Sequence, residues 1–312
     1  MRYVTIRELS DMIRKNLWKI PHDIDLVVGI PRSGLMAANM IALFLNKRLT
    51  DIDSFIDGIV YECGNRGKYV ETGDYHKVLV VDDSVLTGSA ITKVKTKLQP
   101  VANKYDFVFA SPIVSLKGKD FVDVCFEIID DERVFEWNLF HHYFLKNSCM
   151  DIDGVLCCNP EEDDDGDKYR TFLKEAKLLF TPTVTVDTLV TCRLEKYREL
   201  TEEWLKNHNI SYRHLVMLNL PDKESRIKWG KHGEFKGECY KNSKNSLFIE
   251  SSYHEASIIA KVSNKPVICV ETNELLLFMP EMTRIEKIKR KICSRFLKTG
   301  ENRHEPGTIK FS

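Results

Sequence analysis

The 312-residue chain has no apolar run close to the about 20 residues that a membrane-spanning helix needs. Its formal net charge is zero, so bulk electrostatics do not favour nucleic acid as a partner. The nine cysteines are scattered, and no pair has the spacing of a zinc site. The opening residues MRYVTIRELSDMIRK lack the apolar core of a signal peptide. We therefore expect a globular protein with free thiols in a reducing cytoplasm.

A Gly/Ser-rich linker is also absent, although the chain is long enough for two domains. Continuous apolar runs such as DLVVGI (25–30) and HKVLVV (76–81) alternate with helical stretches such as LMAANMIALFLNKRL (35–49). Such runs are typical of parallel strands that helices cover on both faces. Because the pattern restarts near Tyr143, the sequence predicts an α/β protein of two Rossmann-like domains with parallel sheets, at residues 1–142 and 143–283.

The run VLVVDDSVLTGSA (78–90) ends a predicted strand with Asp82 and Asp83. Paired carboxylates at a strand end can bind two vicinal sugar hydroxyls, directly or through Mg²⁺. The following residues turn tightly into a helix, so backbone N–H groups and the hydroxyls of Thr87 and Ser89 would face an anion at the positive end of that helix. A diol on one side and a phosphate on the other describe a ribose 5-phosphate.

This run resembles the loop that binds 5-phosphoribosyl-1-pyrophosphate (PRPP) in type I phosphoribosyltransferases, and the resemblance covers roughly residues 20–140. GIPRSG (29–34) is similar to the pyrophosphate loop of the family, and residues 61–75 stand where the family has its flexible catalytic loop. The resemblance implies a type I phosphoribosyltransferase fold. The implied PRPP-binding residues are Arg32, Ser33, Gly34, Arg66, Lys68, Asp82, Asp83, Ser84, Val85, Leu86, Thr87, Gly88 and Ser89. For Arg66 and Lys68, a solvated basic loop is the alternative.

Members of this family displace pyrophosphate from C1 of PRPP through an oxocarbenium-like state. The resemblance implies that Mg²⁺, Arg32 and loop amides stabilise the leaving group. Asp82 and Asp83 would hold the ribose and are candidate ligands of that Mg²⁺, and attack from the opposite face would give a β-ribofuranoside. No nucleobase-binding hood is recognisable. The acceptor is expected at VFEWNLFHH (134–142), where Trp137 either stacks on a sugar or base or is a domain-interface aromatic.

A second acidic motif, CMDIDGVL (149–156), ends another predicted strand. Asp151 would be a nucleophile, and Asp153, on the same side of an extended chain, a general acid/base. The Asp151 side chain and the Asp153 carbonyl can both reach Mg²⁺, which offsets the repulsion between a phosphate and a carboxylate. Gly154 permits the turn that follows.

The motif resembles the first motif of haloacid dehalogenase (HAD) phosphatases, and the later motifs follow in order. By resemblance, Thr191 in LVTCR binds phosphate, and Lys236 in GEFKGECY is the cation, with Lys231 and Lys241 as alternatives. Glu250 in LFIES would be the remaining metal carboxylate, in place of the commoner aspartate.

Two further features complete this half of the chain. Ser251 would either support the metal or act as a helix N-cap. The stretch between Asp153 and Thr191 has room for one helix, which predicts a HAD fold with minimal or no cap, suited to a phosphate on a bulky substrate. The first half of the chain is an alternative lid.

The C-terminal segment 284–312 contains RIEKIKRKICSRFLK, from Arg284 to Lys298, with seven basic residues against one acidic. Apolar residues recur there at helical spacing, which predicts a basic amphipathic helix followed by a tail. This helix would either contact an anionic membrane surface peripherally or pack on the second domain.

The two halves together resemble the dual-module ribofuranosyltransferases that build bacterial surface polysaccharides. The resemblance implies a two-step β-ribofuranosyltransferase that moves 5-phosphoribose from PRPP to a glycan acceptor, lipid-linked or free, and then hydrolyses the 5-phosphate. The site of action would be the cytoplasm or the inner face of the membrane. A nucleobase phosphoribosyltransferase fused to a nucleotidase and a regulatory PRPP-binding protein are the alternatives, and the oligomeric state stays open.

Overall fold

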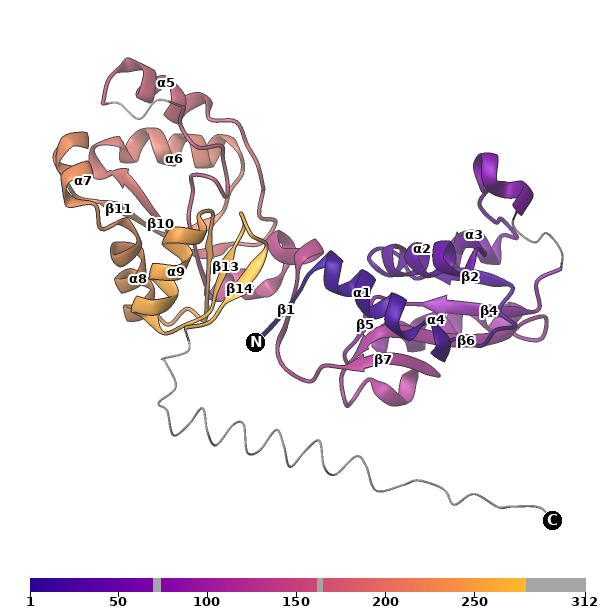
Figure 1. Ribbon diagram of the computed structural model, residues 1–312. Coiled ribbons are helices and arrows are strands. Elements are labelled where there is room, and N and C mark those ends of the chain that lie inside the picture. Colours follow the sequence, from indigo (N-terminus) through magenta and orange to yellow (C-terminus); the bar gives the residue numbers. More distant parts are fainter. Residues whose placement is uncertain (70–73, 162–164, 279–312) are drawn as a thin grey trace, which may run out of the picture.

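The computed structural model describes residues 1–69, 74–161 and 165–278. The chain forms two lobes, each built on a six-stranded sheet (Figure 1). The strands of one sheet lie before residue 129 and those of the other after residue 147, and we call the two lobes the first and second domains. The predicted basic helix from Arg284 to Lys298 lies outside the described residues. No helix in the three described ranges has both the length and the apolarity needed to cross a bilayer.

The sheet of the first domain is parallel and has the order β3-β2-β4-β6-β5, with β7 also paired to β6. Its strands are β2 (Leu26–Gly29), β3 (Arg48–Asp51), β4 (Lys77–Val81), β5 (Ser84–Val85), β6 (Asp106–Val114) and β7 (Val124–Ile128). Its helices are α1 (Ile6–Asn16), α2 (Gly34–Leu45), α3 (Ile52–Ile56) and α4 (Ser89–Leu98). The 3₁₀ helices are η1 (Leu17–Lys19), η2 (Gly64–Tyr69), η3 (Gln99–Val101) and η4 (Lys119–Phe121).

The central strands β2 and β4 are apolar at nearly every position because helices cover both of their faces. Val27 packs in the cluster that contains residues of α1 and α2, whereas Leu26 and Val28 pack with α3 and α4. The start of α1 is fixed by a capping box, in which the Thr5 hydroxyl accepts from the Glu8 amide and the Glu8 carboxylate accepts from the Thr5 amide.

The sheet of the second domain has the order β11-β10-β9-β12-β13-β14, and every neighbouring pair is parallel except β13 with β14. Its strands are β9 (Ser148–Met150), β10 (Val186–Leu194), β11 (Tyr212–Leu218), β12 (Leu247–Glu250), β13 (Val267–Cys269) and β14 (Glu274–Leu276). Its helices are α5 (Asp167–Glu175), η7 (Glu195–Tyr197), α6 (Arg198–Asn207), α7 (Lys223–Trp229), α8 (His232–Asn242) and α9 (Tyr253–Ser263).

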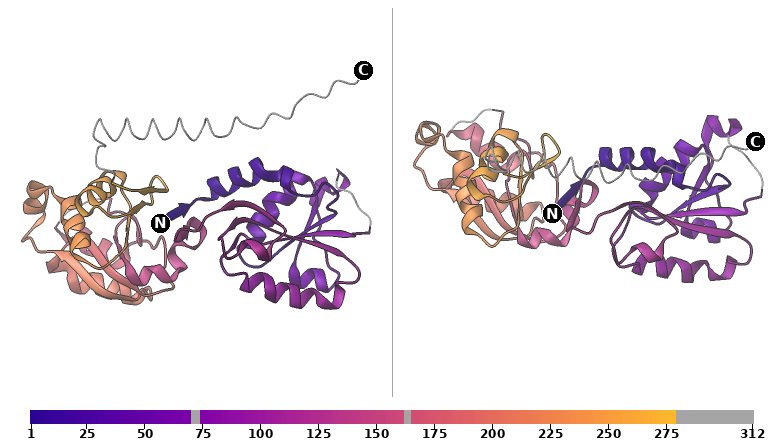
Figure 2. Two further views of the ribbon diagram at one scale, coloured as in Figure 1. Left: turned by 90° about the horizontal axis from the view of Figure 1, so that it is seen from below. Right: turned by 60° about the horizontal axis from the view of Figure 1, so that its bottom comes forward.

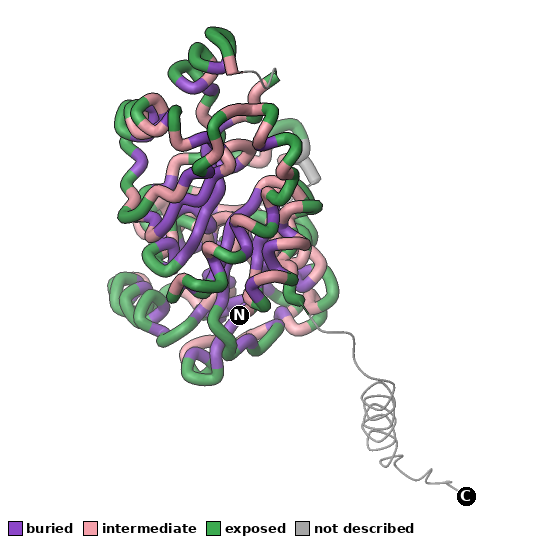
Figure 3. Tube along the Cα trace, turned by 90° about the vertical axis from the view of Figure 1, so that its left-hand side faces the viewer, coloured by how far each residue is buried: buried purple, intermediate pink, exposed green. Residues whose placement is uncertain are grey.

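Helix α6 covers one face of the second sheet through Trp204 and Leu205, and α8 and α9 cover the other. Figure 3, which views this domain from its outer end, shows buried residues along the strands and exposed residues on the outer sides of the helices. Between β9 and β10, α5 is the one α-helix in the described residues, which agrees with the single helix expected for this stretch.

The two domains meet through a small parallel sheet in which β1 (Arg2–Val4) pairs with β8 (Arg133–Phe135). The 3₁₀ helices η5 (Glu136–His141) and η6 (Tyr143–Asn147) follow β8 and lead into β9. Both views of Figure 2 place this junction between the two lobes. The Tyr3 hydroxyl, which β1 carries, donates to the Asn273 side chain of the second domain at 2.6 Å.

The predicted α/β class with parallel sheets in both halves is confirmed. One predicted boundary is wrong, because the helical stretch expected over 35–49 ends at Leu45 and is followed by β3. Asn46 ends this helix in the left-handed region, at φ 53°. The segment 61–75, expected as a flexible loop, contains η2, and its residues 70–73 lie outside the described ranges.

Candidate active sites

The first site lies at the carboxyl ends of β2 and β4. Asp82 and Asp83 follow β4 directly and are 8% and 4% exposed. The Ser33 hydroxyl donates to Asp83 Oδ1 at 2.7 Å, and the indole Nε1–H of Trp137 donates to Asp83 Oδ2 at 3.1 Å. Each Asp83 oxygen therefore has its own hydrogen-bond donor, which fixes the orientation of this carboxylate.

The two carboxyl groups at this strand end interact strongly. Burial, and next the negative charge of Asp83, raises the pKa of Asp82 to about 8. The Asp83 amide donates to Asp82 Oδ1 at 3.0 Å. At neutral pH the pair consequently carries less than two full negative charges.

The loop from Ser84 to Ser89 leaves this carboxylate pair and enters α4. Gly88 precedes the helix at φ 75°, and a Cβ there would overlap the Phe121 ring, so this position requires glycine. Val85 is buried, whereas Leu86, Thr87 and Ser89 are exposed. The exposed hydroxyls stand at the start of the ten-residue helix α4, where the sequence predicts an anion, and that role stays a prediction.

The predicted pyrophosphate loop lies beside the same carboxylates. Ser33 contacts Asp83 directly, and a Cβ at Gly34 would come within 2.9 Å of the Val81 carbonyl oxygen, so the close approach of the two loops depends on glycine. Arg32 is exposed, and its Nη2 donates to Asn138 Oδ1 at 2.8 Å. The structure thus brings Arg32, Ser33 and Gly34 together with the carboxylate pair.

Two predicted donor-site residues lie farther along the chain, in η2. The backbone of Arg66 and Lys68 belongs to this 3₁₀ helix, but their side chains are outside the described part of the structure. Their assignment to PRPP binding therefore stays a prediction.

Trp137 has a different environment from the open stacking surface that the sequence suggests. Its ring stacks on Phe135, with centroids 4.7 Å apart and an interplanar angle of 14°. Its indole N–H already donates a hydrogen bond to Asp83. Sequence reasoning missed Asn138, since a lone polar residue after a tryptophan carries no pattern that would link it to Arg32, 106 positions away.

The second site lies at the carboxyl ends of β9 and β12 and centres on Lys236. Its Nζ donates to Asp151 at 2.7 Å, to Glu250 at 2.8 Å and to Glu255 at 2.6 Å. Lys236 and Glu250 are almost fully buried, and Asp151 is 4% exposed. The structure therefore places Lys236 among the acids, whereas Lys241 is exposed and pairs with Glu238.

The Lys236 ammonium and the carboxylates around it stabilise one another's charges, although burial, and next the charges of Glu250 and Asp153, raise the pKa of Asp151. Burial alone would lower the pKa of Lys236, but the three carboxylates raise it well above its usual value. Burial opposes the charge of Glu255 in the same way, yet His232 and Lys236 lower the pKa of Glu255 to about 2. The cluster consequently holds a charged ammonium next to the proposed nucleophile Asp151.

Asp153, the second carboxylate of the motif, is bound by Arg193. The guanidinium Nε lies 3.0 Å from Oδ2, and Nη2 lies 2.6 Å from Oδ1. The Arg193 side chain is completely buried, and its Nη2 also contacts the Cys157 sulfur at 3.2 Å. Sequence reasoning missed Arg193, although it stands two residues after Thr191 on β10.

Thr191 lies on β10 and Ser251 directly follows β12, the two strands that flank β9 in the sheet. Thr191 is 1% exposed, and its Oγ1 accepts from the Arg193 amide at 3.2 Å. Ser251 donates to Glu250 through its amide at 2.8 Å and its hydroxyl at 3.1 Å. The residue at the N-cap of α9 is Ser252, so Ser251 supports the Glu250 carboxylate and is not the helix cap.

Gly154 makes a close approach possible at the same edge. It has φ 77°, and a Cβ there would lie 2.5 Å from the Ser251 Cβ, so only glycine fits against this loop.

Glu255 is, after Arg193, a second residue of this site that sequence reasoning missed. Its five-residue distance from Glu250 was a usable signal, but the run HEASIIAKVS indicated only a packed helix.

The donor atoms at the second site suit Mg²⁺. Within the described residues, no group of three or more His, Cys, Asp or Glu side chains is placed to hold a metal by itself. Asp151, Glu250 and Glu255 nevertheless converge on one cation, the Lys236 ammonium, and carboxylate oxygens are the ligands that Mg²⁺ prefers. At the first site, Asp82 and Asp83 offer the same type of ligand.

Comparison with known proteins finds no matching family model and no matching curated protein. Among solved structures, the chain is similar to a purine phosphoribosyltransferase from Pyrococcus horikoshii, at 18% identity and a TM-score of 0.33, over 44% of this chain and 92% of that one. It is also similar to a xanthine-guanine-hypoxanthine phosphoribosyltransferase from Helicobacter pylori, at 17% identity and a TM-score of 0.34, over 44% and 92%.

A third solved structure is similar over a larger share of the chain. A chain in the structure of a Pnkp1/Rnl/Hen1 complex has 13% identity and a TM-score of 0.29, over 79% of this chain and 96% of that one. All three similarities are distant, and none of them assigns a substrate or a reaction to this chain.

Proposed function

We propose that the protein is a two-step β-ribofuranosyltransferase that acts on a glycan. The first domain would transfer 5-phosphoribose from PRPP, and the second would remove the 5-phosphate from the product. The observation that carries this proposal is the presence of two complementary sites in one chain. One combines the carboxylate pair Asp82 and Asp83 with an anion-facing loop, and the other surrounds Asp151 with Lys236 and two glutamates.

In the transfer step, the bond between C1 of the ribose and the pyrophosphate oxygen breaks, and an acceptor hydroxyl oxygen bonds to C1 from the opposite face. The acceptor proton passes to solvent or to the departing pyrophosphate. Asp83, held by Ser33 and Trp137, would bind the ribose hydroxyls together with Asp82. Arg32 and the amides of the loop before α4 would stabilise the charge that develops on the leaving group. Mg²⁺ on the carboxylates would assist the departure of pyrophosphate.

In the hydrolytic step, Asp151 would attack the phosphorus of the 5-phosphate, and the sugar alkoxide would leave. Asp153 would give that alkoxide a proton and then take one from the water that hydrolyses the aspartyl phosphate. Thr191 and Lys236 would bind the phosphate oxygens. Mg²⁺ on Asp151 and Glu250 would reduce the repulsion between phosphate and nucleophile.

A glycan acceptor is favoured over a nucleobase because Trp137, an aromatic that contacts the donor carboxylates, is already engaged. Trp137 stacks on Phe135 and donates to Asp83, so it offers no free slot between two aromatic faces for a base. The small insertion between β9 and β10 would leave the phosphatase site accessible to a bulky phosphorylated glycan. The segment from Arg284 to Lys298 would let the enzyme work near a lipid-linked glycan on the inner face of a membrane.

The proposal is tested by incubating the protein with PRPP and Mg²⁺ and a panel of glycans and nucleobases, followed by product masses. We expect a glycan to gain ribose, with release of pyrophosphate and inorganic phosphate. Transfer to a nucleobase alone would instead identify a nucleobase phosphoribosyltransferase with a nucleotidase. Absence of PRPP binding would remove the first site from the proposal.

A further inference from the structure

The segment that joins the domains contributes side chains to both of them. Phe135 and Trp137 pack against the hydrophobic core of the first domain. Leu139 and Phe140, which follow in the same 3₁₀ helix, are buried in a cluster that includes Leu189 of the second-domain sheet. A short stretch of chain is therefore fixed in two cores at once.

Two residues of this segment also reach the donor site. Trp137 donates to Asp83 at 3.1 Å, and Asn138 accepts from Arg32 at 2.8 Å. These two contacts involve the carboxylate proposed to hold the ribose and the guanidinium proposed to meet the pyrophosphate. The segment thus contacts both ends of the expected PRPP position.

We propose that Trp137 and Asn138 are positioning residues of the PRPP site, supplied from the domain junction. The inference rests on the proposed function of the first domain. In this arrangement the segment that carries Trp137 and Asn138 is held by both domains, since Trp137 packs against the first-domain core and Leu139 and Phe140 pack in the second-domain cluster. The second domain would thereby contribute to transfer as well as to hydrolysis.

The physical reason differs for the two residues. Asp83 is 4% exposed, so losing the indole N–H leaves a buried carboxylate oxygen without its donor and lets the group rotate towards Asp82. Arg32 is exposed, so losing the Asn138 oxygen would let the guanidinium sample positions away from the leaving group. Misplacement of such groups by about 1 Å can reduce a rate by about a hundredfold.

The test compares Trp137→Phe and Asn138→Ala with the wild-type full-length protein. Trp137→Phe keeps an aromatic ring against Phe135 but removes the N–H. Matched controls are Trp18→Phe and Asn39→Ala, which change the same residue types at exposed positions. Binding of PRPP is measured by calorimetry, and release of pyrophosphate and hydrolysis of ribose 5-phosphate are measured separately.

We expect each of the two variants to weaken PRPP binding by about tenfold and to slow pyrophosphate release at saturating PRPP, with ribose 5-phosphate hydrolysis and melting temperature close to wild type. Wild-type tryptophan fluorescence should change when PRPP binds, and this change should be absent in Trp137→Phe at saturating PRPP but present in Trp18→Phe.

Two results would overturn the inference. One is PRPP affinity and pyrophosphate release within twofold of wild type in both variants. The other is an equal loss of melting temperature and of both activities, which would make the two residues merely structural. If the wild-type protein itself fails to bind PRPP, the proposed function of the first domain fails instead, and calorimetry on the wild type separates the two cases.

Discussion

The buried guanidinium of Arg193 bonds to both carboxylate oxygens of Asp153, at 2.6 Å through Nη2 and 3.0 Å through Nε. The guanidinium carbon of Arg193 lies 5.7 Å from the centroid of the Phe172 ring. Asp153 thus has its orientation set by a residue from β10, the strand that also carries Thr191. This arrangement suits Asp153 as a proton acceptor, and its proposed transfer of a proton to the leaving alkoxide would require one of the two bonds to Arg193 to open.

Arg193→Gln should therefore reduce hydrolysis of ribose 5-phosphate strongly while PRPP binding stays at the wild-type level. We expect the free energy of unfolding to fall by about 3 kcal/mol, because a partly buried carboxylate loses its partner. Adding Asp153→Asn to this variant should cost less than the sum of the two single changes. Additive losses in a chemical denaturation series would show that the pair is not coupled.

Asp151→Asn should stop the second step and leave the first intact. The variant keeps the shape of the side chain but lacks the nucleophilic oxygen, so a glycan that carries phosphoribose should accumulate. Mass spectrometry of the product reports this directly. Asp83→Asn is the converse control, since it should prevent transfer yet hydrolyse a supplied phosphoribosyl glycan. Loss of transfer in Asp151→Asn would contradict the division of labour between the domains.

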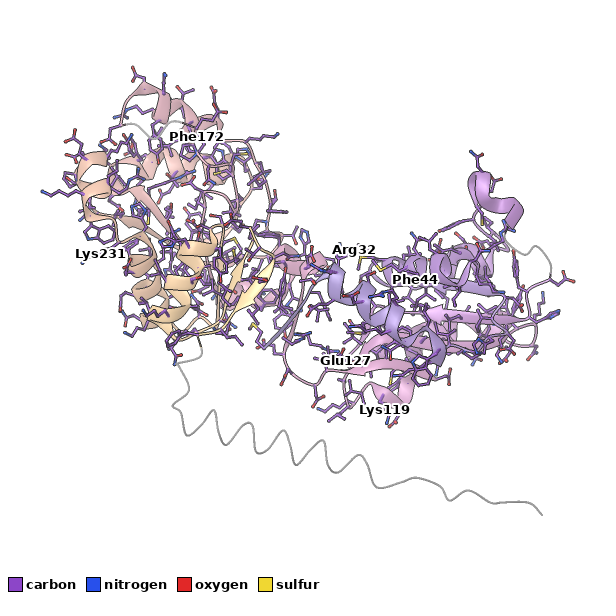
Figure 4. The ribbon with its side chains drawn as sticks, in the orientation of Figure 1. Arg32, Phe44, Lys119, Glu127, Phe172 and Lys231 are labelled. Atoms are coloured by element: carbon purple, nitrogen blue, oxygen red, sulfur yellow. The ribbon has the colours of Figure 1, made fainter. Side chains whose placement is uncertain are left out.

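The two variants should complement each other when mixed. Figure 4 places Arg32 on the side of the first domain near the junction and Phe172, which marks the Arg193–Asp153 pair, away from the junction on α5. An intermediate made at one site must therefore leave it to reach the other. A mixture of Asp151→Asn and Asp83→Asn should give the dephosphorylated product at a rate proportional to the concentration of Asp83→Asn. Persistence of the phosphorylated glycan would indicate direct transfer within one molecule.

Asp82 should make stability fall with rising pH. In the unfolded chain its pKa lies near 3.9, whereas burial and Asp83 raise it to about 8 in the fold. Between these values the unfolded state has released a proton that the folded state keeps, so this group destabilises the fold progressively from about pH 4 to pH 8. Above pH 8 its contribution no longer changes.

The variant Asp82→Asn tests this in Mg²⁺-free buffer. The stability advantage of Asp82→Asn over wild type should be larger at pH 8 than at pH 5 by about 3 to 4 kcal/mol, since the asparagine cannot ionise. The exposed Asp120 provides a matched control, and Asp120→Asn should show no such difference. Parallel pH profiles for Asp82→Asn and wild type would contradict the assignment of the raised pKa.

The fold class was predictable from local patterns. Runs such as KVLVV are apolar at every buried position because both faces of the strand are covered, and that pattern is visible without any tertiary information. Periodicity misplaced the boundary at Leu45, because Leu45 and Leu49 are four residues apart and this spacing also fits a continuing helix, whereas the helix ends at the left-handed Asn46.

The sites were predictable only where chemistry is local in sequence. Each acidic pair is visible in the sequence because its two carboxylates lie within three residues of each other after an apolar run, as Asp82 with Asp83 and Asp151 with Asp153 do. The partners that orient them come from distant segments, with Trp137 54 positions from Asp83 and Arg193 40 positions from Asp153. No spacing rule links such residues, because the packing of separate strands decides which ones meet.

The junction between the domains is crossed by two strands that lie side by side. Tyr3 on β1 and Val134 on β8 are both buried in the second-domain cluster, while Val4 and Phe135, one position further along each strand, pack against the first-domain core. A single connecting strand would allow the two domains to rotate relative to one another. Two hydrogen-bonded strands, each packed in both domain cores, restrict that rotation. The spacing of the two candidate sites would then be fixed, and in the proposed reaction the glycan would be the part that moves between them.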